Sequence, residues 1–398
     1  MKTIWTKRIT ALLLVALLAG LWPIPARAEA AGEITVYSDL NDISKYGNVR
    51  VVINGRVLEA DLKKVGIEYG DSVQIRFLDQ TLRASVVRDF SEVESGAVLL
   101  RLKGDAVELA INTGDFAATY FADMTSAEDG SFSWAYKEGI EGPVAFRITL
   151  LSKAGEDGTP DPIGLAYTNS REDYPNLSDE EFANFRVVAT TGLGDGILCR
   201  SSSPVNPVIH RNRFADAALK EAGVVTVLNL ADTRNAMEAF EGYRETYYAA
   251  IDVLPLNMGM SLASDDFRAK LAEGLRFLCA HEGPYAIHCR EGKDRTGLVA
   301  ALLECFMGAT LDEVTRDYML SFYNYYGIRP GDDLYDMIVE NNICKNLRSF
   351  FEVDDLAQAD LALEAEEYFL SLGLSDAALD ALRENLSQSA ADAAKAAA

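Results

Sequence analysis

The stretch Tyr285–Leu303, "YAIHCREGKDRTGLVAALL", joins a short apolar run to a polar loop and then to a longer apolar run. The first run is typical of a buried β-strand and the last of a buried helix. Cys289 stands where the strand ends, Arg295 follows six positions later, and Thr296 and Gly297 mark the expected start of the helix. The stretch therefore predicts a strand–loop–helix unit, the repeating piece of a parallel α/β sheet.

Strand-like and helix-like segments alternate on both sides of this unit. "VVTVLNL" (224–230) has the continuous apolar pattern of a buried strand, and "DDFRAKLAEGLRFLCA" (265–280) repeats its apolar residues at helical spacing. Alternation of this kind is typical of a mostly parallel sheet that is covered by helices on both faces. We expect an α/β domain with a parallel sheet flanked by helices over residues 175–386.

The chain before this domain has a different residue pattern. Residues 33–152 contain short β-branched segments such as "NVRVVINGRVLEA", separated by Gly, Asn and Asp. They predict a small all-β, barrel-like domain over residues 29–155. The Gly-, Pro- and Asp-rich stretch that begins at Lys153 indicates a linker over residues 156–174, and "SQSAADAAKAAA" at 387–398 is expected to be a disordered tail.

The N-terminus has the pattern of a secretory signal peptide. Three basic residues precede an uncharged apolar run over residues 9–21, and an Ala-Arg-Ala site ends at Ala28. The run is shorter than the about 20 apolar residues that a membrane-spanning helix needs. We expect residues 1–28 to be removed on export, leaving a secreted, cell-surface or periplasmic protein with no stable membrane span.

Composition excludes several classes of function. A net charge of −24 repels nucleic acid and anionic membrane surfaces, so neither is an expected partner. The five cysteines are irregularly spaced, and no Cys-x-x-Cys or His/Cys cluster predicts a metal site. Because five is odd, at least one thiol has no partner within the chain.

The loop after Cys289 has the properties of an anion site. Gly292 and Gly297 let the backbone turn and approach a ligand closely, and the helix N-terminus adds the positive end of its dipole. Arg295 can hold two phosphate oxygens at once, and together these groups favour the thiolate form of Cys289. A thiolate beside a phosphate cradle predicts attack on phosphorus and a phosphocysteine intermediate, with no metal or cofactor.

The same loop carries a family resemblance. "HCREGKDRTG" resembles the His-Cys-x-x-Gly-Lys-Asp-Arg-Thr-Gly loop of bacterial cysteine-dependent protein tyrosine/serine phosphatases. "ILCRSSSP" (197–204) is similar to that family's Tyr/Cys-Arg-Ser motif, and "GVVTVLNLADTR" (223–234) to its Val-x-Asp-Leu-Arg strand, with Asn229 where Asp is usual. The resemblance covers roughly residues 175–385 and implies a hydrolase that acts on phosphotyrosine, with phosphoserine and phosphothreonine as further substrates.

The resemblance also implies roles for single residues. Cys289 is the nucleophile, Arg295 binds the phosphoryl group through the transition state, and Thr296 donates its hydroxyl to the sulfur. His288 is expected to orient the loop. The general acid is placed at Asp294, inside the loop, with Asp252 in "YYAAIDVLPLNMG" (247–259) as the alternative.

Two extra cations in the loop leave the substrate open. Arg290 and Lys293 resemble the loop of lipid and inositol phosphatases, where extra cations hold further phosphates, although Glu291 offsets them. The alternatives are therefore a phosphoinositide or phytase-like inositol-phosphate phosphatase and an inactive phosphate-binding module. A solvated rim of Arg290, Glu291 and Lys293 is an equally good interpretation. Arg200 in the 197–204 motif either supports the loop or forms a surface ion pair, and the ion pair is slightly favoured.

The N-terminal domain has a weaker resemblance of its own. "YGNVRVVI" (46–53) and "GAVLLRLKGDAVELAINTGDFAATYF" (96–121) are similar to the C-terminal β-barrel of S-adenosylmethionine hydroxide adenosyltransferases. The catalytic half of that family is absent from the sequence. We therefore expect an accessory domain that binds a partner or ligand, and no second active site.

Overall fold

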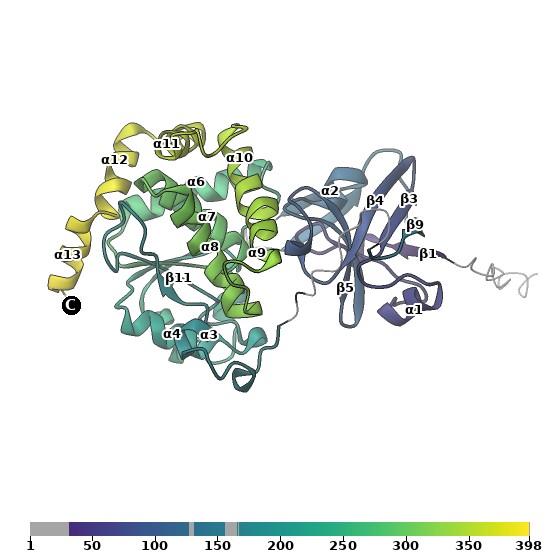
Figure 1. Cartoon of the computed structure of the whole chain (residues 1–398), viewed down its shortest axis with the longest axis horizontal. Coiled ribbons are helices and arrows are strands. Elements are labelled where there is room, and N and C mark those ends of the chain that lie inside the picture. Colours follow the sequence, from purple (N-terminus) through teal and green to yellow (C-terminus); the bar gives the residue numbers. More distant parts are fainter. Residues whose placement is uncertain (1–31, 127–130, 156–164, 166, 398) are drawn as a thin grey trace, which may run out of the picture.

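The computed structural model describes residues 32–126, 131–155, 165 and 167–397. These residues form two lobes, a β-barrel at the N-terminal end and an α/β domain at the C-terminal end (Figure 1). The expected combination of a barrel-like domain and a parallel-sheet domain is confirmed. The predicted signal peptide (1–28) and most of the predicted linker (156–174) lie outside the described residues.

The N-terminal lobe is a β-barrel. Its sheet has the order β1-β9-β3-β4-β5-β6-β2, and β4 and β5 are its parallel pair. Two backbone hydrogen bonds between Tyr37 and Val52 (2.9 and 2.7 Å) join the outer strands, so the sheet closes on itself. Its elements are β1 (Glu33–Ser38), η1 (Leu40–Asp42), β2 (Val49–Arg50), α1 (Glu59–Lys64), β3 (Ser72–Phe77), β4 (Gln80–Val87), η2 (Phe90–Glu92), β5 (Val98–Lys103), β6 (Ala106–Ile111), α2 (Phe116–Tyr120), β7 (Ala122–Ser126), β8 (Phe132–Tyr136) and β9 (Val144–Ser152).

Alternating side chains build the barrel interior. In β3, Val73, Ile75 and Phe77 are buried in the core, while the residues between them face outward. Phe77 and Phe146 pack with ring centroids 4.9 Å apart, and Phe116 lies 5.6 Å from Phe77. Phe116 belongs to α2, so this lobe also contains short helices that the sequence pattern alone does not predict.

The C-terminal lobe is a three-layer α/β domain. Its sheet has the order β10-β11-β14-β12-β13 and is parallel apart from the short edge strand β10. Its elements are η3 (Arg171–Asp173), α3 (Asp179–Phe182), β10 (Arg186–Val187), β11 (Leu198–Ser201), η4 (Pro207–Ile209), α4 (Asn212–Glu221), β12 (Thr226–Asn229), α5 (Arg234–Glu238), η5 (Tyr243–Glu245), η6 (Tyr248–Ala250), β13 (Asp252–Pro255), α6 (Asp265–Ala280), β14 (Tyr285–His288), α7 (Asp294–Met307), α8 (Leu311–Tyr326), α9 (Asp333–Ile338), the π-helical turn η7 (Val339–Cys344), α10 (Lys345–Phe351), α11 (Leu361–Ser371), α12 (Asp376–Asn385) and α13 (Gln388–Ala397).

The central strands are buried on both faces. Leu228 and Ile287 pack into a large apolar core with helices α6, α7 and α11. Val227 and Ala286, their neighbours along the strands, point to the other face and pack with Leu219 of α4. This two-sided burial explains why the strands have continuous apolar sequences.

Two sequence-based expectations need correction. Helix α7 begins at Asp294, before the predicted start at Thr296, so Asp294 and Arg295 lie in its first turn instead of in the loop. Residues 387–398, expected to be a disordered tail, form α13 over Gln388–Ala397. Ala391 of α13 is buried, and the helix contacts α12, because its small side chains allow close packing.

The two lobes meet along η7. Ser95 of the barrel donates its backbone N–H to Asn341 O (3.0 Å) and its hydroxyl to Asn346 Oδ1 (2.7 Å). Lys345 and Glu94 form an ion pair (2.7 Å) beside these contacts. The acceptor Asn341 O belongs to the π-helical turn η7, which is wider than an α-helical turn, and Asn346 belongs to α10, which follows it directly.

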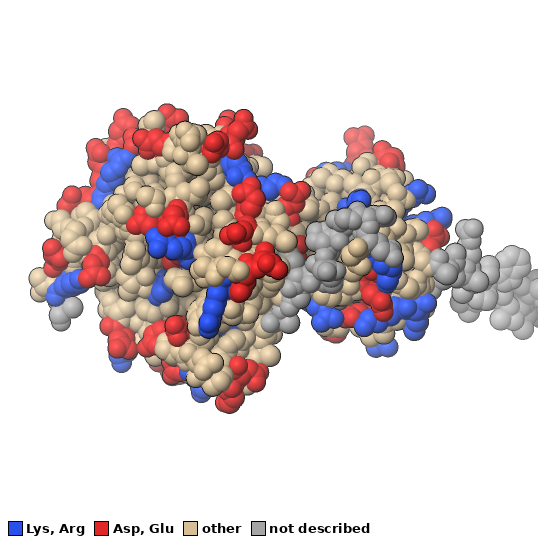
Figure 2. Space-filling view, in the orientation of Figure 1, with Lys and Arg blue, Asp and Glu red and all other residues tan. Residues whose placement is uncertain are grey.

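On the face in Figure 2, Asp and Glu side chains predominate over the α/β lobe. This distribution agrees with the acidic composition of the chain. Among the described helices, none is both long and apolar enough to cross a membrane.

Candidate active site

The loop between β14 and α7 is held by its carbonyl groups. All five carbonyls of residues 289–293 accept hydrogen bonds from the surrounding domain. The carbonyl of Cys289 accepts from His288 Nδ1 (3.0 Å), and that of Arg290 accepts from Ser203 N (2.9 Å). The carbonyl of Glu291 accepts from Asn184 Nδ2 (3.0 Å) and Tyr325 Oη (2.9 Å). The carbonyls of Gly292 and Lys293 both accept from Arg200 Nη2 (3.0 and 3.3 Å). Because the C=O and N–H of a peptide point in opposite directions, the loop N–H groups face inward. They form the anion nest that the sequence predicts, at the N-terminus of α7.

Gly292 is required by the tight turn of this loop. Its φ of +70° lies in the left-handed region, and a Cβ at this position would come 2.1 Å from the carbonyl oxygen of Ser201. The loop therefore packs directly against the end of β11. Any side chain at this position would displace either the loop or the strand.

Arg200 supports the loop from inside the domain. The slightly favoured prediction that it forms a surface ion pair is therefore wrong. Its side chain is fully buried and forms an ion pair with Asp317 of α8 (2.5 Å) while holding the loop carbonyls. Arg186 pairs with the same carboxylate (2.7 Å). Burial alone would raise the pKa of Asp317, but the two guanidinium groups lower it to about 2. Arg200 is therefore part of a buried network that fixes the shape of the loop.

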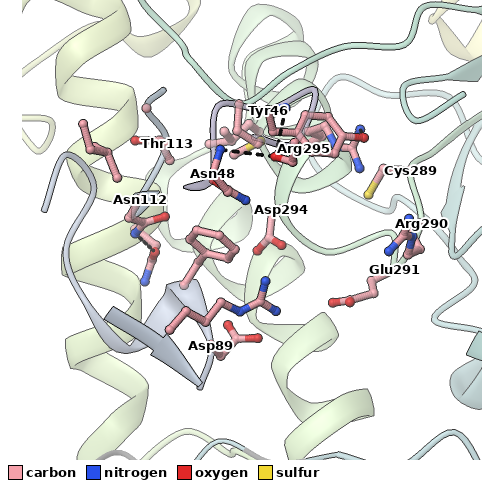
Figure 3. Close-up of a pocket in the computed structure, with 18 of the residues that line it drawn as sticks. Tyr46, Asn48, Asp89, Asn112, Thr113, Cys289, Arg290, Glu291, Asp294 and Arg295 are labelled. Carbon is pink, nitrogen blue, oxygen red and sulfur yellow. Dashed lines mark hydrogen bonds between the residues drawn. The ribbon is translucent and has the colours of Figure 1, made fainter. Parts of the chain in front are cut away.

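Cys289 lies at the base of the nest and lines a cavity of about 440 Å³ between the two lobes (Figure 3). Its side chain is buried. Thr296, in the first turn of α7, is also buried, and its hydroxyl has no hydrogen-bond partner among the described residues. A hydroxyl placed near the loop and left unpaired is available to a group that enters or forms there. All five cysteines of the chain are free thiols.

Arg295 is held by one of its terminal nitrogens. Nη1 donates to the carbonyls of Leu230 (3.0 Å) and Met258 (2.9 Å) and to the phenol of Tyr46 in the barrel (3.3 Å). Its Nε and Nη2 make no hydrogen bond to a described residue. These two nitrogens form the edge of a guanidinium group that can hold two oxygens of one phosphoryl group. Asp232, after β12, adds a nearby negative charge that favours the charged form of Arg295.

His288 is a neutral supporting residue. Burial lowers its pKa to about 4. Its Nδ1–H donates to the carbonyl of Cys289 (3.0 Å), so Nε2 is the unprotonated nitrogen and accepts from the Tyr248 hydroxyl (2.8 Å). The ring thus links the loop to η6 on the other side of the sheet and does not reach the cavity.

The structure separates the two candidates for the general acid. The Asp294 side chain lines the cavity that holds Cys289 and is 39% exposed. Partial burial, together with the negative charges of Asp89 and Glu291, raises its pKa to about 6 against the opposing charge of Lys293. Asp252 is exposed at the start of β13, paired with Thr226 at the start of β12. Cys289 follows the carboxyl end of the parallel strand β14, at the opposite edge of the sheet. Of these two candidates, Asp294 is therefore the one that shares a cavity with Cys289.

The two extra loop cations occupy different environments. Arg290 is exposed and lines the cavity together with Glu291. The Lys293 side chain is fully buried, and its ammonium contacts Asp89 of the barrel (3.1 Å) and the Tyr326 hydroxyl (2.8 Å). The solvated rim is therefore wrong for Lys293, and this residue is not free to hold a second phosphate. Gly297 packs against Tyr318 and Arg200, so its role is packing beneath the loop.

Sequence reasoning misses the residues that the barrel adds to the site. The same cavity as that of Cys289 is lined by Lys45, Tyr46, Asp89 and Arg101. Figure 3 shows Tyr46 and Asp89 among its lining residues. These four residues come from loops and a strand nearly 200 residues or more before Cys289 and match no motif. Their place follows from how the lobes dock, which no local pattern encodes.

Part of the sequence matches a known protein family. Residues 210–388 match the tyrosine phosphatase family. No curated protein matches the chain. The resemblance of the N-terminal domain to the adenosyltransferase barrel has no support from these comparisons and stays a prediction.

Solved structures give distant similarities. One is an uncharacterized conserved protein from Thermotoga maritima (18% identity, TM-score 0.22, 30% of this chain and 36% of that chain covered), so the chain spans about a third of that protein's length. A second is P. aeruginosa TpbA in complex with pTyr (18% identity, TM-score 0.30, 52% and 100% covered). A third is the core catalytic domain of the PP-IP phosphatase SIW14 from S. cerevisiae in complex with citrate (20% identity, TM-score 0.26, 42% and 91% covered).

The family match spans Cys289, the loop after it and the helices that support them. Over these residues the α/β lobe is similar to the tyrosine phosphatase family.

Proposed function

We propose that the protein hydrolyses phosphomonoesters through a phosphocysteine intermediate on Cys289, with phosphotyrosine as its preferred substrate. The observation that carries the proposal is the loop itself. Its carbonyls accept hydrogen bonds from the surrounding domain, so its N–H groups face inward, and Arg295 lines the same cavity as Cys289 with Nε and Nη2 making no hydrogen bond to a described residue. Donors fixed in this way stabilise the charge of a transferring phosphoryl group without having to reorganise.

In the first step the Cys289 thiolate attacks phosphorus in line with the ester oxygen. The S–P bond forms as the P–O bond breaks, and the electron pair leaves with the ester oxygen. Protonated Asp294 gives its proton to that oxygen, so the product leaves as a neutral alcohol or phenol. A carboxyl with a raised pKa suits this task because a useful fraction remains protonated near neutral pH.

In the second step water attacks the phosphocysteine. The Asp294 carboxylate takes a proton from the water, the new P–O bond forms, and the S–P bond breaks to return the thiolate. The unpaired Thr296 hydroxyl can donate to the sulfur as it regains negative charge. The products are inorganic phosphate and the original enzyme.

Aromatic side chains favour an aryl phosphate. Tyr46, Phe90 and Tyr318 line the cavity, and flat apolar walls suit a phenyl ring. Inositol phosphates are the second candidate, because Lys45, Arg101 and Arg290 line the same cavity beyond Arg295 and could hold further phosphates.

The decisive assay is phosphate release in the presence of EDTA. Phosphotyrosine peptide, phosphoserine peptide, a phosphoinositide and phytate are the substrates, with Cys289→Ser as the matched control. We expect phosphotyrosine to have the highest kcat/KM and Cys289→Ser to lose roughly 10³-fold or more of the activity. Preference for phytate or the phosphoinositide would move the assignment to the second candidate. Equal phosphate binding by both forms without turnover would identify a binding module.

We further propose that the protein is exported, on the support of the signal-peptide pattern in residues 1–28. Expression of the full chain followed by mass measurement of the protein outside the cytoplasm tests this. A mature form that begins at Glu29 is expected. An uncleaved protein confined to the cytoplasm would contradict it.

A further inference from the structure

We propose that the N-terminal barrel is part of the active site, and that Asp89 and Tyr46 are positioning residues that fix Lys293 and Arg295 of the phosphate loop. The inference rests on the phosphatase chemistry proposed above. It assigns a role to a domain that otherwise looks like an accessory module.

The first contact is made by Asp89, just before η2. Both of its oxygens lie against the Lys293 ammonium (3.1 and 3.3 Å), and the Tyr326 hydroxyl completes the group (3.1 Å from Asp89 and 2.8 Å from Lys293). The Lys293 side chain is fully buried, so this pair is largely shielded from solvent. Glu291 (3.8 Å) and Asp294 (3.9 Å) of the α/β lobe lie farther from the ammonium, so Asp89 is the carboxylate that holds it most closely. A buried ammonium needs such a partner, so docking of the barrel favours this position of Lys293.

The second contact is made by the neighbouring loop of the barrel. The Tyr46 phenol accepts from Arg295 Nη1 (3.3 Å), and the Arg295 guanidinium carbon lies 5.3 Å from the centre of the Tyr46 ring (Figure 3). Lys45 anchors this loop by donating to the carbonyl of Ala231 (3.0 Å) and to the side chain of Asn257. Tyr46 therefore adds a contact from the barrel to the two carbonyls that already hold Nη1, and Nε and Nη2 of Arg295 make no hydrogen bond to a described residue.

The contacts also set the charge balance around Asp294. The charged groups that face this carboxyl are Lys293, Arg295, Asp89 and Glu291, and the phenol of Tyr318 lies on the α8 side. Asp89 neutralises Lys293, which would otherwise favour the Asp294 carboxylate. Losing the Asp89 charge would therefore make the general acid give up its proton at lower pH.

The test uses the full chain with Asp89→Asn, Tyr46→Phe and, as matched control, Glu94→Gln. Glu94 also joins the barrel to the α/β lobe, through Lys345, but lies away from the loop. For Asp89→Asn we expect the alkaline limb of kcat/KM on phosphotyrosine to move down by about one pH unit. In the double variant Asp89→Asn/Lys293→Gln the charges balance again, so the limb returns towards its wild-type position. Glu94→Gln should keep the wild-type profile.

Tyr46→Phe keeps the ring and removes the hydroxyl. We expect tungstate, a phosphate mimic that is not turned over, to bind about fivefold more weakly, since a charge-assisted hydrogen bond no longer fixes Arg295. An unchanged pH profile in Asp89→Asn together with unchanged tungstate affinity in Tyr46→Phe would overturn the inference while leaving the phosphatase proposal intact. Weaker tungstate binding in both variants, with no turnover by the wild type, would support the inference and reject the proposed function.

Discussion

At the scale of single residues, Asp294 is the group whose protonation decides the proposed chemistry. It stands in the first turn of α7, where a carboxyl usually favours its charged form, yet burial raises its pKa to about 6. A general acid must be protonated to act, so its contribution is present below this pKa and is lost as pH rises through it.

We therefore expect kcat/KM for phosphotyrosine to fall above about pH 6, and Asp294→Asn to abolish this alkaline limb. The variant should lose roughly 10²- to 10⁴-fold in kcat on phosphotyrosine. Much less should be lost on a substrate such as p-nitrophenyl phosphate, whose leaving group needs no proton. Asp252→Asn is the control and should match the wild type. A pH profile that Asp252→Asn alters and Asp294→Asn does not would reverse the assignment.

Asp317 is the second residue with a sharp prediction, in this case for stability. Its pKa is held at about 2 in the folded protein by Arg186 and Arg200, below the about 3.9 of an unperturbed Asp. The stabilisation is therefore fully present above about pH 4 and is lost as pH falls towards 2. Asp317→Asn should cost about 3–5 kcal/mol at neutral pH, because it removes the carboxylate that pairs directly with two buried guanidinium groups and leaves only the neighbouring Glu304 carboxyl to offset their charge.

Urea denaturation of wild type and Asp317→Asn at pH 7 and pH 3 measures this. The difference in unfolding free energy should shrink at the lower pH. A difference that stays constant between the two would show that the charge of Asp317 does not stabilise the fold.

At the scale of elements, the strand–loop–helix unit was predictable in kind. The apolar runs and the Cys-to-Arg spacing place β14, the loop and α7 correctly, because these depend on local pattern. The start of α7 was misplaced because Asp294 and Arg295 are polar residues typical of a loop, yet they form the first turn of the helix. The donors that hold the loop carbonyls, such as Asn184 and Tyr325, come from distant segments and carry no motif.

The loop's shape gives a prediction at Gly292. Gly292→Ala combines a positive φ with a contact of 2.1 Å to the Ser201 carbonyl, so the loop must move. Gly308→Ala, at the C-terminal end of the same helix, has a positive φ but nothing within 4 Å. We expect both variants to lose about 1 kcal/mol or more of stability, and only Gly292→Ala to lose most of its activity. Equal kcat values in both variants would contradict the role of the turn.

At the scale of the whole molecule, the docking of the lobes should be linked to activity. Ser95 lies almost fully buried in the seam, against Asn341 and Asn346. Ser95→Leu inserts bulk there and should separate the lobes, whereas Glu94→Leu adds bulk at a neighbouring exposed position. We expect Ser95→Leu to reduce kcat/KM about tenfold or more although it touches no loop residue, because Lys293 and Arg295 lose their barrel contacts.

Scanning calorimetry with parallel assays checks this prediction. A split thermal transition accompanied by lost activity in Ser95→Leu is expected, with Glu94→Leu close to wild type. Full activity in a variant whose lobes melt separately would mean that the barrel is dispensable for catalysis. The sequence could not give this link, since composition and periodicity describe each domain but not the surface by which they meet.

The pairing of Asp89 with Lys293 joins two positions 204 residues apart. A chain is made from its N-terminus, and domains tend to fold in that order. The barrel can thus fold before the part of the chain that contains Cys289 is synthesised. The Asp89 carboxylate is then already in its folded position when Lys293 is added to the chain. Catalytic competence is then the last property the growing chain acquires, and an interrupted product would carry a folded barrel but no working thiolate.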